Sequence, residues 1–242
     1  MSALLEVRSV SKSFHGLRAV HDASFEVPPG AINALIGPNG AGKTTIFNMV
    51  AGVYPPDAGE IVFDGRRING LRPDQMCAAG IGRTFQIVKP FAGLSVLDNV
   101  IVGALLREKS VAAARQVSRD ILEKLHLGSK SNLPASSLSL PDRKRLEVAR
   151  ALATRPTLLL LDEVMAGLRP IECDQMVEVF RGLNRREGLT ILLIEHVMRA
   201  VMALAQDIGV LHQGEVIARG MPAEVVRDPA VLECYLGEEI EV

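Results

Sequence analysis

The chain has 242 residues, of which 48% are hydrophobic and 23% charged, and its formal net charge is −1. This is the composition of an ordinary globular protein, and it excludes an overall field that would attract nucleic acid or an anionic membrane. No apolar run is long enough to cross a bilayer, and the first residues do not resemble a secretory signal. The three cysteines are far apart without metal-ligand spacing, so we expect reduced thiols in a cytosolic protein.

Strand patterns dominate the first part of the chain. Leu5 to Val10 alternates between apolar and polar residues, and Phe25 to Val27 and Glu60 to Phe63 look similar. Asp64-Gly65 predicts a hairpin turn, so this part is expected to be partly antiparallel. Phe14 has two open interpretations, because its ring suits either stacking on adenine or a place in the core.

A complete phosphate-binding loop follows, made of Gly37, Pro38, Asn39, Gly40, Ala41, Gly42, Lys43, Thr44 and Thr45. It lies between an apolar run, Ala31 to Ile36, and a helix-like stretch, which is the context that this motif requires. The glycines let successive N–H groups point at phosphate oxygens, and the next helix presents its positive end to the same anion. Lys43 supplies a charge for the β- and γ-phosphates, and the Thr44 hydroxyl is a ligand for Mg²⁺. The loop therefore predicts nucleotide binding.

Helical patterns run from about residue 95 to 150. Ser95 and Asp98 resemble a capping box, and 112–127 carries apolar residues at helical spacing. Ser139 and Asp142, with Pro141 between them, also make a good helix start. We expect a helical subdomain at about residues 90–150, inserted in an α/β core.

Two almost purely apolar runs, Leu158 to Leu161 and Ile191 to Ile194, predict strands buried on both faces of a parallel sheet. Ligands bind at the carboxyl edge of such sheets, where Asp162 and Glu163 follow the first run. Asp162 is predicted to support Mg²⁺, and Glu163 to orient or deprotonate the attacking water. His196 follows the second run and is predicted to contact the γ-phosphate or hold the water.

Three features remain. Gln86 has a carbonyl that can ligate Mg²⁺, although the local sequence alone does not single it out. Residues 208–218 predict two strands around Gln213-Gly214. A short tail at about residues 221–242 has helical character and three glutamates near its end.

Taken together, these motifs resemble the nucleotide-binding subunits of ABC transporters. The order along the chain matches: Phe14, the loop 37–45, Gln86, a signature region at Leu138-Ser139, Asp162 and Glu163, and His196. Four peptides are similar to the ATP-binding subunits of high-affinity branched-chain amino-acid importers: Gly80 to Gln86, Val164 to Leu168, Ile194 to His196, and Tyr235 to Gly237.

The resemblance implies a P-loop NTPase of the RecA-like α/β class, with a mainly parallel sheet, an N-terminal antiparallel β subdomain and the inserted helical subdomain. Residues 1–242 would form a single ABC-type nucleotide-binding domain that hydrolyses ATP. Phe14 and the loop would bind ATP, Thr44, Gln86 and Asp162 would hold Mg²⁺, and Glu163 and His196 would be catalytic.

The family also implies partners and a location. A second ATPase, identical or different, would pair head to tail with this chain, so that Ser139 meets ATP bound to the other domain. Two membrane permeases would hold the pair at the cytoplasmic face of the inner (plasma) membrane as a peripheral subunit. An extracytoplasmic binding protein would act with them indirectly, and no nucleic acid would be bound.

Two segments depart from the family pattern. The family signature Leu-Ser-Gly-Gly-Gln reads Leu-Ser-Leu-Pro-Asp at residues 138–142. Pro141 has no N–H to offer a phosphate, and Asp142 adds a negative charge, for which Arg143, Lys144 and Arg145 are the expected compensation. The second departure is Arg169, where the family usually has Asp. Both changes concern the contact between two domains and leave this chain's own phosphate loop intact.

Other functions have less support in the sequence. A soluble ABC-type ATPase of DNA repair or translation normally has two cassettes or a long coiled coil, whereas this chain has one cassette and no sustained heptads. A guanine-nucleotide switch would carry Asn-Lys-x-Asp, which is missing. A module that binds ATP without hydrolysis is disfavoured by Glu163 and His196. An exporter ATPase shares the core motifs, and only the importer-like peptides argue against it.

Overall fold

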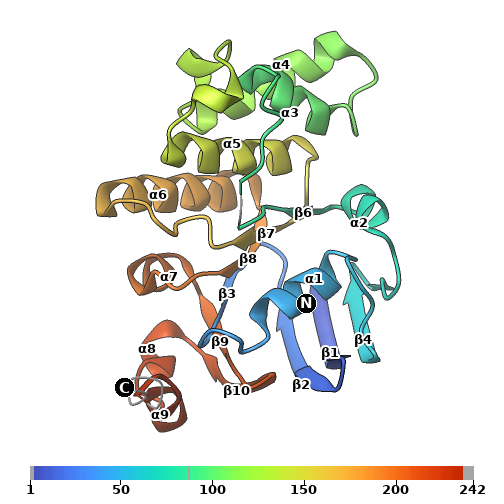
Figure 1. Cartoon of the computed structure of the whole chain (residues 1–242), viewed down its shortest axis with the longest axis vertical. Helices are drawn as coiled ribbons and strands as arrows, with labels where there is room; N and C mark the ends of the chain where they lie inside the picture. The colour runs from blue at the N-terminus through green and yellow to red at the C-terminus, as the bar shows by residue number, and fades with distance from the viewer. Residues whose placement is uncertain (1–2, 87, 237–242) are drawn as a thin grey trace.

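A six-stranded sheet forms the centre of the computed structural model, which describes residues 3–86 and 88–236 (Figure 1). Its strand order is β10-β9-β3-β8-β7-β6. All neighbouring strands are parallel except β10, which pairs antiparallel with β9. The strands are β3 (Ile32–Ile36), β6 (Ile81–Arg83), β7 (Leu158–Asp162), β8 (Thr190–Ile194), β9 (Asp207–His212) and β10 (Glu215–Gly220).

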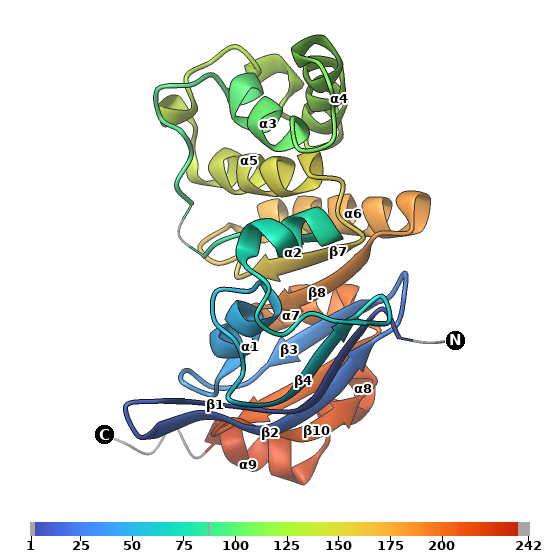
Figure 2. The ribbon, with the colours of Figure 1, turned by 90° about the vertical axis from the view of Figure 1, so that its right-hand side faces the viewer.

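A second, antiparallel sheet of order β2-β1-β4-β5 lies at the opposite end of the molecule from α3 and α4 (Figure 2). Its strands are β1 (Leu5–Phe14), β2 (Leu17–Val27), β4 (Ala58–Phe63) and β5 (Arg66–Arg67). The turn at Asp64-Gly65 has φ of 48° and 71°, as hairpin turns between twisted strands require. Both this hairpin and the one at Gln213-Gly214 confirm the sequence predictions.

The apolar runs in β7 and β8 are buried on both faces, as predicted. Ile191 and Leu193 belong to one hydrophobic core, and Leu192 and Ile194 belong to the other. Successive side chains of a strand point to opposite faces, so a strand between two cores has no position for a solvated residue. The first core joins the sheet to the helices, and the second joins it to the antiparallel sheet.

Helices cover the central sheet. Between the central and antiparallel sheets lies α1 (Lys43–Val50), and α2 (Pro73–Ala79) precedes β6. Three helices build a layer at one end of the molecule (Figure 1): α3 (Val96–Ala104), α4 (Val111–Lys124) and α5 (Leu140–Ala153). Short 3₁₀ turns at Gly128–Lys130 and Ala135–Ser137 connect α4 to α5, while α6 (Pro170–Glu187) and α7 (Met198–Leu204) lie nearer the sheet.

The helical layer begins where the sequence predicts it and differs at one later boundary. Ser95 caps α3, because its Oγ accepts the Asp98 N–H at 3.0 Å and donates to Asp98 Oδ2 at 2.6 Å. The helix expected at 112–127 instead ends at Lys124. His126 has φ of 58°, which ends the helix, yet Leu125 and Leu127 remain buried. The apolar pattern therefore continues beyond the helix that it suggested.

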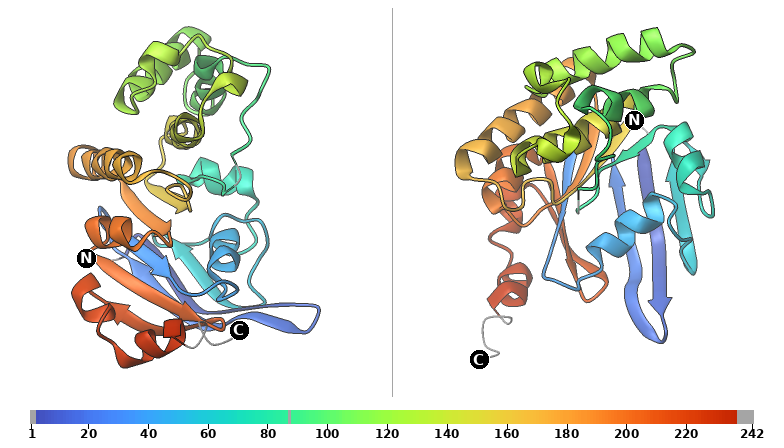
Figure 3. Two further views of the ribbon diagram at one scale, coloured as in Figure 1. Left: turned by 60° about the vertical axis from the view of Figure 1, so that its left-hand side comes forward. Right: turned by 45° about the horizontal axis from the view of Figure 1, so that its top comes forward.

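The chain's last described segments, α8 (Pro222–Val225) and α9 (Pro229–Leu236), pack beside β9 and β10 (Figure 3). Gly237 and the three tail glutamates lie outside the described residues. No helix within residues 3–86 and 88–236 combines the length and apolar character of a membrane span.

Candidate active site

The phosphate-binding loop connects β3 to α1 at the carboxyl end of β3, one of the two middle strands of the sheet. The Lys43 Nζ donates to the carbonyls of Gly37 and Pro38, both at 2.6 Å, so the ammonium lies across the loop. Thr44 lies in the first turn of α1 and is exposed to solvent. A helix N-terminus that follows a loop of this kind directs backbone donors and a positive dipole toward an anion.

Two positions of the loop require glycine, because the backbone of another strand lies too close for a Cβ atom. A Cβ at Gly37 would lie 2.0 Å from the Leu211 carbonyl oxygen, and one at Gly42 would lie 2.5 Å from the Ala19 carbonyl oxygen. Gly40 differs, because its φ is 79° but nothing lies within 4 Å of the corresponding position. The loop therefore packs closely against β9 at Gly37 and against β2 at Gly42, and it has free space at Gly40 between them.

Asp162 ends β7 and is only 2% exposed. Its Oδ2 accepts from the Arg83 guanidinium at 3.0 Å, and Arg83 also donates to Asn48 Oδ1 of α1 at 2.6 Å. Burial raises the pKa of Asp162, while the hydrogen bond and charge of Arg83 oppose that rise. Arg83 thus ties the carboxylate to the helix that follows the phosphate loop, a contact that sequence reasoning missed.

Three predicted side chains meet at the Glu163 carboxylate. Gln86 Nε2 donates to Glu163 Oε2 at 2.6 Å, and His196 Nδ1 lies 3.9 Å from the same oxygen. They come from the segment after β6, the end of β7 and the end of β8, three adjacent strands. Their side-chain amide, carboxylate and imidazole can together bind and orient one small polar molecule.

An open pocket of about 490 Å³ contains the predicted Mg²⁺ ligands. Thr44, Gln86 and Asp162 line it together. Hydroxyl, amide and carboxylate oxygens are the donor types that Mg²⁺ prefers, so the residues present fit this ion. Because Gln86 donates through Nε2 to Glu163, its Oε1 is left for the ion.

Phe14 lies at the end of β1, and it is 37% exposed. Its ring packs edge-on against Tyr54 with centroids 5.2 Å apart, and the Lys12 ammonium lies 5.7 Å from its centre. Tyr54 in turn accepts from Asn48 Nδ2 at 3.1 Å, which connects the ring to α1. Adenine stacking by Phe14 stays a prediction.

The altered signature forms the start of α5. Ser139 is its N-cap residue, and the Ser139 Oγ donates to Asp142 Oδ2 at 2.8 Å. Asp142 is 5% exposed and pairs with Lys130 and Arg145. Burial acts to raise the pKa of Asp142, but hydrogen bonds from Lys130 and Ser139 outweigh it, and the net shift is downward. Contact between Ser139 and a nucleotide on a second domain stays a prediction.

Three basic residues were expected to compensate the negative charge of Asp142, and one of the three does so. Arg145 reaches Asp142 at 3.7 Å, whereas Arg143 donates to the Ser136 carbonyl and Lys144 to the Glu163 carbonyl. Lys130, twelve residues earlier, is the cation that sequence reasoning missed. It was missed because a 3₁₀ turn brings it back to the start of α5.

Arg169, the second departure, precedes α6. Its guanidinium donates to Glu172 Oε1 at 2.6 and 2.9 Å, while Glu172 Oε2 accepts the Arg169 backbone N–H. Its side chain is 78% exposed. In this chain Arg169 therefore stabilises a helix start and leaves most of its surface accessible.

Two further buried groups near Glu163 were also missed. Lys144 of α5 donates to the Glu163 carbonyl at 2.8 Å, and Glu195 Oε1 accepts the Met165 N–H at 2.7 Å. Lys144 is 6% exposed and Glu195 is 2% exposed. The sequence carries a signal for Glu195, because it is a carboxylate directly after an apolar strand, as Asp162 is.

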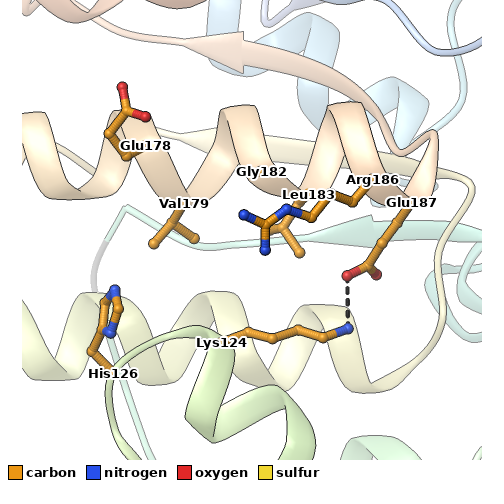
Figure 4. A pocket seen from close by; sticks show the side chains of 8 residues that line it. All are labelled: Lys124, His126, Glu178, Val179, Gly182, Leu183, Arg186 and Glu187. Atoms are coloured by element: carbon orange, nitrogen blue, oxygen red, sulfur yellow. Dashed lines mark hydrogen bonds and ion pairs between the residues drawn. The ribbon is translucent and has the colours of Figure 1, made fainter.

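A second pocket, of about 270 Å³, lies between α6 and the end of α4 (Figure 4). Lys124 and His126 face α6 across it, and Lys124 pairs with Glu187 at 2.6 Å. Its lining mixes both signs of charge: Lys124, His126, Glu178, Val179, Gly182, Leu183, Arg186 and Glu187. It contains none of the predicted site residues.

Comparison with known families agrees with this geometry. Residues 20–166 match the model of the ABC transporter family, and residues 215–241 match a model described as branched-chain amino acid ATP-binding cassette transporter. The second match covers β10, α8 and α9 and ends at residue 241.

Individual relatives match over nearly their whole length. The chain is 38% identical to the high-affinity branched-chain amino acid transport ATP-binding protein LivG of Escherichia coli (strain K12), with 97% of this chain and 98% of LivG covered. It is 37% identical to the lipopolysaccharide export system ATP-binding protein LptB of the same organism, covering 99% and 100%. The crystal structure of the ADP conformation of MJ1267, an ATP-binding cassette of an ABC transporter, superposes with a TM-score of 0.89 at 29% identity, covering 98% and 100%. These matches confirm the predicted resemblance and fold class.

The close approach at Gly37 generates a prediction about the loop. We expect Gly37→Ala to weaken nucleotide binding at least about tenfold, because a strained backbone conformation costs about 1–3 kcal/mol and the new Cβ also overlaps the Leu211 carbonyl. Gly40→Ala is the matched control, since it has a positive φ without the overlap. Titration with a fluorescent nucleotide measures both variants, and equal losses would contradict the steric argument.

Proposed function

Because the chain belongs to the ABC transporter family, whose cassettes are ATPases, we propose that it hydrolyses ATP to drive import of branched-chain or related amino acids across the cytoplasmic membrane. The proposal of ATP hydrolysis rests on one observation: the side chains of Gln86 and His196 both lie beside the same carboxylate oxygen of Glu163, near the phosphate loop. In this proposal residues 1–242 act as one nucleotide-binding domain, with a helical subdomain at about 90–150 and a tail at about 221–242.

The loop 37–45 binds the triphosphate. Its backbone N–H groups and the start of α1 face the phosphates, and Lys43 turns from the Gly37 and Pro38 carbonyls to the β- and γ-phosphates. Phe14 stacks on the adenine from the end of β1. The polar contacts thereby bind the phosphates, and the ring binds the base.

Mg²⁺ fits the oxygens of Thr44, Gln86 and Asp162. Bound there, the ion would supply positive charge that neutralises the phosphates. Arg83 holds Asp162 in position through one carboxylate oxygen and leaves the other oxygen for the ion.

Glu163 acts on the water. Its carboxylate orients the molecule and accepts its proton as the oxygen attacks the γ-phosphorus, and ADP leaves as the bond to its β-phosphate oxygen breaks. The Gln86 amide holds the carboxylate at 2.6 Å. His196, with its side chain 63% exposed, is free to reach the γ-phosphate while remaining beside Glu163.

The substrate class is inferred from relatives. The match at residues 215–241 and the similarity to LivG both favour amino-acid import. A second candidate is the ATPase of an exporter, because LptB is nearly as similar. The carboxy-terminal match favours import.

The membrane partners are two permease subunits at the cytoplasmic face, working with an extracytoplasmic binding protein. The docking surface proposed here is Gln86 with the loop Ile87 to Leu94, of which Ile87 lies outside the described residues. The Phe91 ring is 46% exposed, whereas its backbone N–H and carbonyl are both held by Asn99, at 2.8 and 3.1 Å. Arg150 stacks on the ring at 4.8 Å. A fixed, exposed aromatic side chain is a good anchor for a partner.

A second ATPase domain completes the site, with Ser139 of one domain facing the nucleotide of the other. In this chain the Ser139 hydroxyl is already donated to Asp142, and Pro141 offers no N–H. We therefore favour pairing with a sister subunit whose signature serves this chain's Lys43 and Glu163.

The catalytic assignment predicts distinct effects for two substitutions. Lys43→Ala should abolish detectable nucleotide binding, because the charge on the β- and γ-phosphates is lost. Glu163→Gln should retain binding within about threefold and slow phosphate release at least about a hundredfold, since an amide cannot accept the water's proton. Nucleotide titration and a phosphate-release assay separate the two, and undiminished hydrolysis by Glu163→Gln would remove Glu163 from the catalytic role.

The docking assignment predicts that Phe91→Asp weakens assembly with the permeases about thirtyfold, as expected for loss of an anchor that contributes about 2 kcal/mol. Leu17→Asp, at a residue 73% exposed at the start of β2, is the control that should assemble normally. Co-purification from membranes measures both. If the Phe91 variant assembles as the control does, the permease binds elsewhere.

Import itself is tested with the complex that co-purifies with the tagged chain, reconstituted in lipid vesicles with its binding protein. We expect ATP-dependent transport of labelled leucine, isoleucine or valine, and none when the chain carries Lys43→Ala. ATP hydrolysis with extraction of lipopolysaccharide and no amino-acid transport would instead support the exporter function.

A further inference from the structure

The backbone at Glu163 adopts a conformation that a glutamate does not favour by itself. Its φ is 49°, in the left-handed region that non-glycine residues rarely occupy. Such a conformation costs about 1–3 kcal/mol and persists only where the surroundings enforce it. The Glu163 N–H donates to the Ile194 carbonyl at 2.9 Å, which fixes one side of the residue to β8.

Two buried side chains fix the other side. Lys144 Nζ donates to the Glu163 carbonyl at 2.8 Å, and Glu195 Oε1 accepts the Met165 N–H at 2.7 Å. The first comes from α5 and the second from the end of β8. Between them they hold the backbone groups on the two sides of Val164, the residue that follows the strained one.

The two side chains also compensate each other's charge. Burial raises the pKa of Glu195 to about 7, and the Met165 N–H and the charge of Lys144 oppose that rise. Burial lowers the pKa of Lys144, and the charges of Glu195 and Glu163 oppose that change. Glu195 Oε2 is buried without a hydrogen-bond partner, so the carboxyl is kept there at a cost.

We propose that Lys144 and Glu195 form a positioning pair that holds the strained Glu163 backbone, and thereby places its carboxylate beside Gln86 and His196. The inference rests on the proposed role of Glu163 in activating water. Because Lys144 is the fifth residue after Ser139, the pair also connects the start of the signature helix directly to the catalytic turn.

The geometry favours this role over simple satisfaction of buried charges. A purely structural pair would bond mainly to itself, whereas here the Lys144 ammonium and the Glu195 carboxylate each form a hydrogen bond with the backbone of the catalytic turn. The strain is at Glu163 itself, so relaxation of the turn moves the carboxylate directly. A misplacement of about 1 Å is enough to cost about a hundredfold in rate.

Kinetic variants test the pair in the assembled transporter. We expect Glu195→Ala and Lys144→Met each to lower kcat about ten- to a hundredfold while KM for ATP stays within about threefold, because one charged hydrogen bond to the turn is lost. Glu195→Gln keeps an oxygen for the Met165 N–H and should retain most of the rate. Ile61→Val, in the core beneath the antiparallel sheet, is the control for loss of stability alone.

Amide hydrogen exchange supplies a readout that needs no hydrolysis. Exchange at Met165 in the nucleotide-free chain should accelerate at least about tenfold in Glu195→Ala, remain slow in Glu195→Gln, and be unchanged in Ile61→Val. This distinguishes failure of the inference from failure of the proposed function, which would appear as a wild-type chain that does not hydrolyse ATP.

Three results would overturn the proposal. One is a normal kcat in Glu195→Ala. Another is a decrease in kcat that matches the fraction of protein unfolded, as in the Ile61 control. The third is unchanged Met165 exchange in Glu195→Ala, which would mean that the turn holds its shape without the pair.

Discussion

The left-handed backbone at Glu163 is the constraint on which the site's geometry depends. If Glu163 had an ordinary extended backbone, the chain after β7 would continue straight, and the Glu163 carboxylate would point away from the neighbouring strands. The turn at Glu163 instead brings Oε2 to within 2.6 Å of Gln86 Nε2 and 3.9 Å of His196 Nδ1. Hydrogen bonds from β8 and α5 to the turn compensate the strain, so that the surrounding fold enforces the shape of the site.

The helix α5 links the separate parts of this machinery. Its residues Lys144, Glu147 and Arg150 are spaced by three and lie on one face. Lys144 holds the catalytic turn, Glu147 accepts a backbone hydrogen bond from Phe85, and Arg150 donates to the Lys89 carbonyl at 3.2 Å. The same helix begins at the altered signature. A shift of α5 would therefore move the turn, the segment around Gln86 and the proposed permease surface together.

Much of this could be predicted from the sequence, for physical reasons. The runs in β7 and β8 follow from burial on two faces, and the phosphate loop follows from its glycines. The pairs Arg83–Asp162 and Lys130–Asp142 could not be foreseen, because each joins residues from different elements. The end of α4 was misplaced because Leu127 is buried after a left-handed His126. The spacing of apolar residues along the chain predicts which residues are buried. Which charged residues pair depends on how the helices and strands pack against one another.

The most direct test of this account is a crystal structure of the Glu163→Gln variant with Mg·ATP. The turn at Glu163 must form before nucleotide binds. Residue 163 should therefore keep a positive φ, with Lys144 Nζ still within hydrogen-bond distance of its carbonyl oxygen and Glu195 still accepting the Met165 N–H. A residue 163 in ordinary extended or helical conformation, with its carbonyl released from Lys144, would contradict the central claim.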